Sequence, residues 1–358
     1  MKKVVLLAPT PPPYGGIAGW TKRMMEANLK DDWNVLVVDE KVIGGRSVFG
    51  KESKKNLRTE IQRCFKIWRN LWKALDDKDV LVVHSCIPSG TTSMMREYVC
   101  ALITKLRKRQ FIIHYRCTVP NTTKGKIGLA LLRMLSKKSD LIIALNQQTV
   151  DYLSSLTKTP ICLIPNFVTL GESDQRISVN KTIKRIIYVG GVIKEKGCLD
   201  IFETASYFPN IDFKLIGSVD DEIRRIAADH ENVNIAGEMN REEVRRELLA
   251  ADVFIFLSHF SGEGFSNALA EAMAVGLPCV VTNWAANKDM IGNDGGVVVE
   301  VDNITDVVSA IKYLQLPEIR ENCSVYNYNK VRKCYSSDIV LDMYVNEYNK
   351  VCGIRREN

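Results

Sequence analysis

The sequence lacks the signatures of several classes of protein. Its ten cysteines include no Cys-x-x-Cys pair, and its four histidines stand far apart in the chain. This spacing argues against a zinc site and is typical of free thiols in a reducing compartment. No apolar run approaches the roughly 18 residues that a membrane-spanning helix needs. Met1, Lys2 and Lys3 lead directly into the strand-like residues 4–7, so we expect no signal peptide and a cytoplasmic protein.

The overall composition is that of a globular protein. The chain has 358 residues, of which 46% are hydrophobic and 25% charged, and this length suits two domains. The formal net charge of +7 is compatible with an anionic partner. No motif that reads RNA or DNA accompanies this charge, so we expect no nucleic-acid partner.

Short apolar runs alternate with helical patterns along the whole chain. This alternation predicts mostly parallel sheets that are covered by helices on both faces. The pattern stops in the polar residues 169–182 and starts again at Ile186. The sequence therefore predicts an α/β fold of two domains, 1–168 and 183–336, joined by the linker 169–182. Two such domains predict a central cleft that is lined by the ends of parallel strands.

One stretch, residues 261–278, combines the features of a ligand site. A buried strand is predicted just before it, and Glu263 then lies in a loop between two glycines. Ser266 or Asn267 can cap the helix that follows, and the N-terminus of a helix favours phosphate. Glu271 shares a helix face with Asn267, and its carboxylate is costly on so apolar a helix unless it meets a partner. We predict a site for a phosphorylated ligand that is rich in hydroxyl groups.

Several motifs together give the chain a resemblance to a known family. Glu263 and Glu271 are spaced as in the E-x7-E motif of the retaining glycosyltransferases of family 4, which the chain resembles. Four further segments match that family in order along the chain: Pro13-Tyr14-Gly15-Gly16, Ile164-Pro165-Asn166-Phe167-Val168, Tyr188-Val189-Gly190 with Glu195-Lys196-Gly197, and Gly276 to Thr282. The resemblance implies the GT-B fold, with two Rossmann-like domains. It also implies a C-terminal helix, about residues 337–358, that crosses back to the N-terminal domain.

The resemblance also implies a role for each matched residue. Glu271 would hold the ribose hydroxyls of a nucleotide diphosphate sugar, and Lys196 would neutralise the departing diphosphate. Glu263 would act at the catalytic centre on the sugar hydroxyls. The remaining donor-binding positions would be Gly16, Gly190, Gly264, Phe265, Ser266 and Asn267. The family needs no divalent metal, so we expect neither a metal nor another cofactor.

The chain departs from the family at two places in the basic half of the site. Gly191 stands where the family usually has an arginine, so either another cation completes the diphosphate clamp or the donor sits differently. Arg116 is a candidate for that cation. Many members have a histidine after the fourth strand that reaches the donor sugar. We assign this catalytic role to His114, although Arg116 could be the aligned position. Gly15 and Arg116 are the candidate contacts for the acceptor or for phosphate.

The expected activity is transfer of a sugar from a nucleotide diphosphate donor to a hydroxyl of a saccharide acceptor, which can be lipid-linked. We expect the donor to be linked to uridine. A nucleotide-sugar epimerase of the same fold is the first alternative. An NAD-type oxidoreductase is the second, because Gly15, Gly16 and Gly19 follow a strand and Asp39 ends the next one. The acidic pair Asp77 and Asp79 precedes a strand and is interpreted as a turn.

Residues 51–75 have the pattern of a basic amphipathic helix with tryptophans. Apolar residues occur at helical spacing from Leu57 to Leu75, and the tryptophans Trp68 and Trp72 are among them. The whole range 51–75 contains eight basic residues. Such a helix can pack on the sheet and also bind an anionic membrane surface. We therefore expect a peripheral association with the cytoplasmic face of a membrane.

Overall fold

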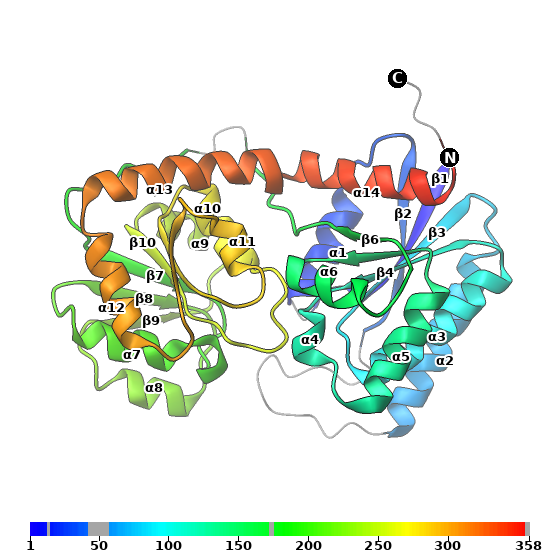
Figure 1. Cartoon of the computed structure of the whole chain (residues 1–358), viewed down its shortest axis with the longest axis horizontal. Helices are drawn as coiled ribbons and strands as arrows, with labels where there is room; N and C mark the ends of the chain where they lie inside the picture. Colours follow the sequence, from blue (N-terminus) through cyan, green and yellow to red (C-terminus); the bar gives the residue numbers. More distant parts are fainter. Residues whose placement is uncertain (13–14, 42–56, 172–174, 355–358) are drawn as a thin grey trace. The chain divides into compact units, whose positions relative to one another are not determined.

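The computed structural model describes residues 1–12, 15–41, 57–171 and 175–354. The chain divides into two compact units (Figure 1). The first comprises residues 1–166 together with 338–358, and the second comprises residues 167–337. Residues 169–182, the expected linker, thus belong to the second unit. Within it, the backbone N–H of Ile177 donates to the carbonyl of Val275 at 2.9 Å.

The described part of the first unit contains a six-stranded parallel sheet in the order β2-β1-β3-β4-β5-β6. Its strands are β1 (Lys2–Ala8), β2 (Trp33–Asp39), β3 (Val80–Ile87), β4 (Gln110–Tyr115), β5 (Leu141–Ala144) and β6 (Ile161–Leu163). Its helices are α1 (Gly16–Glu26), α2 (Leu57–Ala74), α3 (Thr91–Leu106), α4 (Val119–Thr122), α5 (Gly125–Lys138) and α6 (Gln147–Ser154). Central strands such as β1 are apolar along their length because helices cover both faces of the sheet, and residues 4–8 are fully buried.

The second unit repeats this architecture, with a six-stranded parallel sheet in the order β12-β11-β10-β7-β8-β9 among the described residues. Its strands are β7 (Arg185–Val189), β8 (Asp212–Ile216), β9 (Val233–Gly237), β10 (Val253–Phe256), β11 (Cys279–Thr282) and β12 (Gly296–Val299). Its helices are η1 (Lys194–Lys196), α7 (Cys198–Ser206), α8 (Asp221–Ala227), α9 (Arg241–Leu249), α10 (Asn267–Ala274), α11 (Asn287–Ile291), α12 (Ile304–Tyr313), α13 (Pro317–Lys330) and η2 (Val331–Tyr335). These two parallel sheets confirm the predicted fold class.

In each sheet the strand order reverses at one point. The chain builds outward from β1 to β2 and then continues from β3 on the other side, and in the second sheet it does so between β7 and β10. Loops that leave adjacent strands in opposite directions at such a point leave a crevice at the carboxyl ends of the strands. The loops after β7 and β10 contain Gly190 and Glu263, so the predicted ligand residues of the second unit lie where its topology favours binding.

The last helix, α14 (Ser337–Val351), belongs to the first unit from Asp338 onward, as expected. Lys30 forms an ion pair with Asp342 at 2.7 Å. The indole N–H of Trp33 donates to the side-chain oxygen of Asn349 at 2.9 Å. In Figure 1 this red helix runs beside the blue and cyan elements of the first unit.

Helix α1 begins at Gly16, because Gly15 is an extended N-cap residue and its carbonyl accepts from the N–H of Gly19 at 2.8 Å. Helix α13 continues directly into the π-helical turn η2. Pro317 starts this helix at a position where proline is tolerated, and no glycine or proline interrupts it afterwards.

Candidate active site

The glycine loop after β7 is held against the end of β10 in the second unit. Gly190 has φ +150° and Gly197 has φ +72°, conformations that residues with a side chain rarely adopt. A Cβ atom on Gly197 would lie 2.3 Å from the carbonyl oxygen of Leu257. Only glycine fits this contact, and the contact fixes the short helix η1 that presents Lys196.

Lys196 and Glu263 come together from two loops that are distant in sequence. The ammonium of Lys196 forms an ion pair with the carboxylate of Glu263. It also lies over the rings of Phe256 and Phe260, at 5.5 and 5.1 Å from their centroids. Ser258 donates a long hydrogen bond of 3.4 Å to the same carboxylate. The expected cation and the expected loop carboxylate are thus direct partners.

Helix α10 has the predicted cap and the predicted buried body. The hydroxyl oxygen of Ser266 accepts from the backbone N–H of Leu269 at 3.2 Å, which satisfies one of the donors at the helix start. Asn267, Ala268 and Glu271 are the residues of this helix that remain half-buried, and the other residues of the helix are buried. Asn267 and Glu271 therefore share the one accessible stripe of an otherwise buried helix.

The two remaining donor-loop residues are packed into the second unit. Gly264 is buried. The ring of Phe265 meets the ring of Tyr335 edge-on, with the centroids 5.2 Å apart. Phe265 thereby ties the loop to the end of η2, so its backbone N–H is held at the start of α10 by side-chain packing.

No side chain is available at Gly191 to complete a basic clamp. The hydroxyl of Tyr188 donates to the carbonyl of Gly191 at 2.8 Å, so this turn is held by its backbone. A Cβ atom on Gly190 would lie 2.7 Å from the same hydroxyl. The basic side chains of this loop are Lys194, which is exposed, and Lys196, which is paired with Glu263.

The predicted residues of the first unit fall into two groups. Gly15 and Gly16 start helix α1 and are exposed, and a Cβ atom on either would have no neighbour within 4 Å among the described residues. His114 and Arg116, in contrast, are buried at the end of β4. The structure therefore brings Lys196 and Glu263 into contact. Gly190, Gly264 to Asn267 and Glu271 belong to the same second unit, and the other predicted residues belong to the first.

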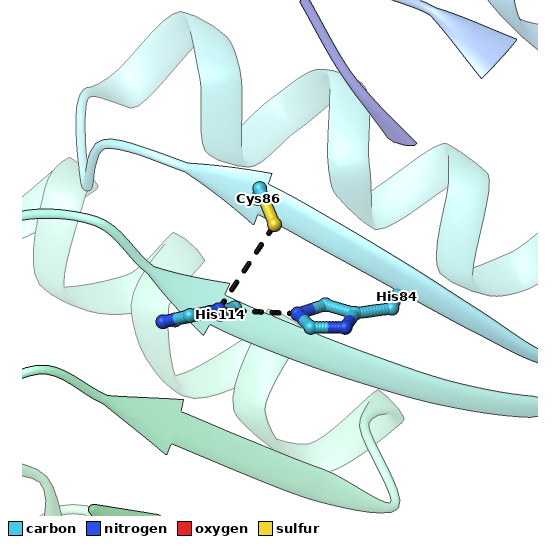
Figure 2. Close-up of side chains that lie close together, drawn as sticks. All are labelled: His84, Cys86 and His114. Atoms are coloured by element: carbon cyan, nitrogen blue, oxygen red, sulfur yellow. Dashed lines mark hydrogen bonds between the residues drawn. The ribbon is translucent and has the colours of Figure 1, made fainter. Parts of the chain in front are cut away.

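His114 is not an isolated residue, and neither is His84. Strand β3 pairs with β4 so that Cys86 lies opposite His114, and His84 is two residues away on the same face. The ring nitrogens of the two histidines are 3.1 Å apart, and the Sγ atom of Cys86 is 4.0 Å from His114 Nδ1 (Figure 2). His84 and His114 are far apart in the sequence, but the parallel pairing of β3 and β4 brings them into contact. The interpretation of the histidines as isolated is therefore wrong for this pair.

The environment of these histidines keeps them neutral. Both rings are fully buried. Burial, with a smaller contribution from the charge of Arg116, lowers the pKa of His84 to about 3. Burial also holds the pKa of His114 well below its usual range, aided by the charges of Arg116 and His84. The second nitrogen of His114 lies 3.2 Å from a guanidinium nitrogen of Arg116. Both ring nitrogens of His114 therefore have partners inside the first unit.

Arg116 also contacts a residue whose role sequence reasoning missed. Its guanidinium donates to the side-chain oxygen of Asn166 and lies 4.7 Å from the ring centroid of Trp20. Asn166 is part of the Ile-Pro-Asn segment that carried the family resemblance. That segment was the available signal, but nothing in it indicated which side chain the asparagine would meet.

The residues that suggested other functions have structural partners. Asp39 accepts from the backbone N–H and the hydroxyl of Thr10 at 3.0 and 2.8 Å, so it ties down the loop after β1. Asp77 and Asp79 lie 2.7 and 3.7 Å from the ammonium of Lys3, in the turn before β3. The turn interpretation of the acidic pair is confirmed.

The comparisons with known proteins agree with the fold. The family model for glycosyl transferases group 1 matches residues 171–330, nearly all of the second unit. The N-acetyl-alpha-D-glucosaminyl L-malate synthase of Bacillus anthracis is 24% identical over 303 residues, which are 77% of this chain and 76% of that protein. A shorter match, 30% identical over 118 residues and 30% of each chain, is the UDP-Gal:alpha-D-GlcNAc-diphosphoundecaprenol alpha-1,3-galactosyltransferase of Escherichia coli.

Among solved structures, the sucrose-phosphate synthase of Thermosynechococcus elongatus superposes with a TM-score of 0.79, at 15% identity, over 99% of this chain and 100% of that one. The two parallel sheets and these matches define an enzyme with the GT-B fold. The protein is a glycosyltransferase, and its second unit matches group 1 of these enzymes. An epimerase or oxidoreductase is not favoured.

Proposed function

We propose that the protein is a retaining glycosyltransferase that uses a UDP-linked sugar and a saccharide acceptor. The observation that carries this proposal is the arrangement in the second unit of Lys196, Glu263 and the accessible stripe of α10 at the strand reversal. The name of the Escherichia coli relative, which includes a UDP-linked galactose donor and a diphosphoundecaprenol acceptor, supports a UDP-linked donor and a lipid-linked acceptor.

Each residue of the second unit has a task that follows from its chemistry. The carboxylate of Glu271 accepts hydrogen bonds from the two ribose hydroxyls of the donor. The diphosphate binds at the start of α10, where backbone N–H groups and the helix dipole favour negative charge. Lys196 balances the charge that develops on the leaving diphosphate, and Glu263 holds sugar hydroxyls.

The reaction that fits these groups is a displacement on one face of the sugar. The bond between the anomeric carbon and the phosphate oxygen breaks, and the acceptor oxygen forms its bond to that carbon on the same face. The acceptor hydroxyl proton passes to an oxygen of the leaving phosphate, so no protein nucleophile is required.

Donor recognition can be tested by thermal shift with a panel of nucleotide diphosphate sugars. A ligand at about 100 times its dissociation constant adds roughly 2.7 kcal/mol to the free energy of unfolding, a shift of several degrees for domains of this size. We expect the largest shift with a UDP-sugar, and loss of that shift in Glu271→Ala.

The matched control is Glu203→Ala, which removes an exposed carboxylate from α7 in the same unit. It should keep the full shift. A wild-type-sized shift in Glu271→Ala would exclude the ribose role. The stereochemical part has its own test: NMR of the product should show the anomeric configuration of the donor, and inversion would contradict it.

We further propose that helix α2 binds an anionic membrane surface. The helix packs on the sheet through Ile67 and Leu71, which are buried. A second group of its apolar side chains remains exposed, namely Leu57 at 74%, Ile61 at 47%, Phe65 at 64% and Trp72 at 41%. The packed stripe is thus narrower than the sequence pattern indicated.

The exposed apolar group has basic neighbours on the same helix. Leu57, Ile61 and Phe65 are four residues apart, so they line one face. The exposed residues Arg58, Lys66, Arg69 and Lys73 continue round the helix from that face. Apolar side chains beside basic ones are the pattern of an interfacial helix. None of the described helices is long and apolar enough to cross a bilayer.

Vesicle co-sedimentation tests this surface. Wild-type protein should bind vesicles of phosphatidylcholine with phosphatidylglycerol, bind pure phosphatidylcholine weakly, and dissociate from the anionic vesicles as salt is raised. Phe65→Ser with Ile61→Ser should weaken binding about tenfold or more, because two exposed apolar side chains are lost. Tyr313→Ser, at an exposed aromatic of the second unit, is the control. Equal binding by the α2 variant and the wild type would contradict the proposal.

A further inference from the structure

Four buried side chains of the first unit form a continuous chain of polar contacts that ends at Arg116. The hydroxyl of Tyr348, on α14, lies 2.7 Å from His84 Nδ1. His84 Nε2 lies 3.1 Å from His114 Nδ1, and His114 Nε2 lies 3.2 Å from Arg116 Nη1. Tyr348 and both histidines are fully buried, and Arg116 is 8% exposed. We call these four residues the histidine relay.

Because Arg116 can only donate hydrogen bonds, the position of each ring proton in the relay follows from it. A guanidinium has donors and no acceptor, so His114 Nε2 must accept from Arg116. The proton of His114 is then on Nδ1 and is donated to His84 Nε2. The proton of His84 is in turn on Nδ1 and is donated to Tyr348. These tautomers are assigned from the hydrogen-bond network, and they require both rings to be neutral. Burial, which lowers the pKa of both histidines, acts in the same direction.

The same assignment argues against a metal ion between His84, Cys86 and His114. These three residues could offer ligand atoms that all lie within 4.8 Å of one another. A metal would take the lone pair of His114 Nδ1, however, and would leave Nε2–H facing the N–H groups of Arg116. It would also need the thiolate of Cys86, whereas burial raises the pKa of that thiol far above its usual range. Hydrogen bonding explains the cluster better.

Arg116 itself is a buried cation whose described partners are neutral. They are the ring of His114, the amide oxygen of Asn166 and the face of Trp20. Its Nε has no hydrogen-bond partner, and no carboxylate of the described residues forms an ion pair with it. A buried charge without a counterion is costly. Arg96 in the same unit has carboxyl partners instead, because its guanidinium lies 2.9 and 2.7 Å from oxygens of Glu40 and Glu97.

We propose that the histidine relay holds Arg116 charged and oriented as the seat for a phosphate group of a substrate. The proposal rests on the proposed function for the substrate that carries this phosphate, either the donor diphosphate or a phosphorylated acceptor. His84, His114 and Tyr348 are positioning residues. A neutral relay leaves the guanidinium without a competing anion until the phosphate arrives, and it fixes the direction of the guanidinium through three side chains from β3, β4 and α14.

The relay is tested first without any substrate. In protein labelled with ¹⁵N-histidine, long-range ¹H–¹⁵N NMR should show His84 and His114 as Nδ1–H tautomers that do not titrate between about pH 5.5 and 8.5, since both pKa values are strongly lowered. The other two histidines, His230 and His259, are half-buried and serve as internal references. Nε2–H tautomers would overturn the relay. So would stoichiometric zinc in the purified protein, detected by elemental analysis and lost in Cys86→Ser.

The isosteric variant Tyr348→Phe tests whether the far end of the relay acts on Arg116. It removes the acceptor of His84 Nδ1–H, so His84 can move its proton to Nε2, reverse the relay and confront Arg116 with a donor. We expect altered histidine tautomers and a several-fold weaker affinity for UDP or a several-fold higher KM for the acceptor. Tyr344→Phe is the matched control, because this buried tyrosine is one turn away and its hydroxyl has no hydrogen-bond partner. It should behave as the wild type, and equal behaviour of the two variants would overturn the coupling.

Arg116→Gln identifies the phosphate that the seat receives. Loss of a charge-assisted hydrogen bond should cost about tenfold or more in affinity. Weaker binding of UDP would indicate the donor diphosphate. An unchanged UDP affinity with a higher acceptor KM would indicate the acceptor. If neither changes in a folded variant, the seat is excluded, even where Glu271→Ala and product NMR support the glycosyltransferase reaction.

Discussion

The two units place charge at the ends of their strands in opposite ways. In the second unit, Lys196 is half-buried and is paired with Glu263 in a loop beside the accessible stripe of α10. In the first unit, Arg116 is buried among neutral partners and is oriented by two buried histidines. The same architecture thus supports a largely buried ion pair in one unit and, in the other, a buried cation without an ion-pair partner among the described residues.

The difference shows how each site can change when a phosphate binds. The ammonium of Lys196 already has an anion, so a phosphate must share it with the carboxylate of Glu263. The guanidinium of Arg116 has none, so a phosphate there would complete its charge balance. We therefore expect substitution of Lys196 to act mainly on the chemical step and substitution of Arg116 to act mainly on affinity.

The largest effect is expected for Lys196→Ala. This variant removes the cation that faces the leaving diphosphate and also leaves Glu263 without its ion-pair partner. Removing one preorganised group that stabilises developing charge costs about 10²–10³ in rate. We expect that loss in kcat/KM, measured with a UDP-sugar donor and the protein in its folded form, as judged by circular dichroism.

Lys194→Ala is the control for this prediction, because Lys194 is an exposed lysine of the same short helix. It should retain most of the activity. A similar loss in both variants would indicate a general effect of positive charge near the loop. An active Lys196→Ala enzyme would contradict the role of Lys196 in stabilising the leaving diphosphate.

A smaller and divided effect is expected for Glu263→Gln. The amide is nearly isosteric but no longer competes for the ammonium of Lys196, so UDP should bind a few-fold more tightly. The carboxylate that holds sugar hydroxyls is lost at the same time, so kcat should fall about tenfold or more. Isothermal titration with UDP and steady-state kinetics measure the two parts separately. Weaker UDP binding would contradict the competition between phosphate and Glu263.

The second-unit site could be predicted from the sequence because its residues are close together in the chain or belong to recognisable sequence motifs. The strand, the Glu263 loop, the Ser266 cap and the Glu271 position all fall within about one supersecondary unit. The glycines of the loop after β7 could also be predicted as a loop motif, since positive φ angles restrict those positions to glycine. The contact between Lys196 and Glu263, which are 67 residues apart, required the fold.

The histidine relay could not be predicted in the same way. His84 and His114 are 30 residues apart, and His84 and Tyr348 are 264 residues apart. The register between β3 and β4 brings His84 next to His114. The packing of α14 in the first unit brings Tyr348 next to His84. Neither register nor packing has a local signature in the residues concerned, because any buried polar residue can occupy such a position. The helical stripe of α2 was misjudged for a related reason: periodicity predicts which residues share a face and does not say how wide the packed part is.

The smallest effect is expected at the other buried charge cluster of the first unit, where Arg96 faces two carboxylates. Burial, and then the neighbouring Glu97, raise the pKa of Glu40 well above its usual range. The folded state therefore holds a proton on Glu40 that the unfolded chain releases at lower pH, so Glu40 lowers the free energy of unfolding as pH rises above its unfolded pKa of about 4.3. Glu40→Gln keeps the shape and removes this loss. We expect its melting temperature to exceed that of the wild type by about 2–4 °C near pH 8 and to match it near pH 4.5. Melting curves at the two pH values measure this difference. An equal or lower melting temperature of the variant at pH 8 would show that Arg96 stabilises both carboxylates as anions.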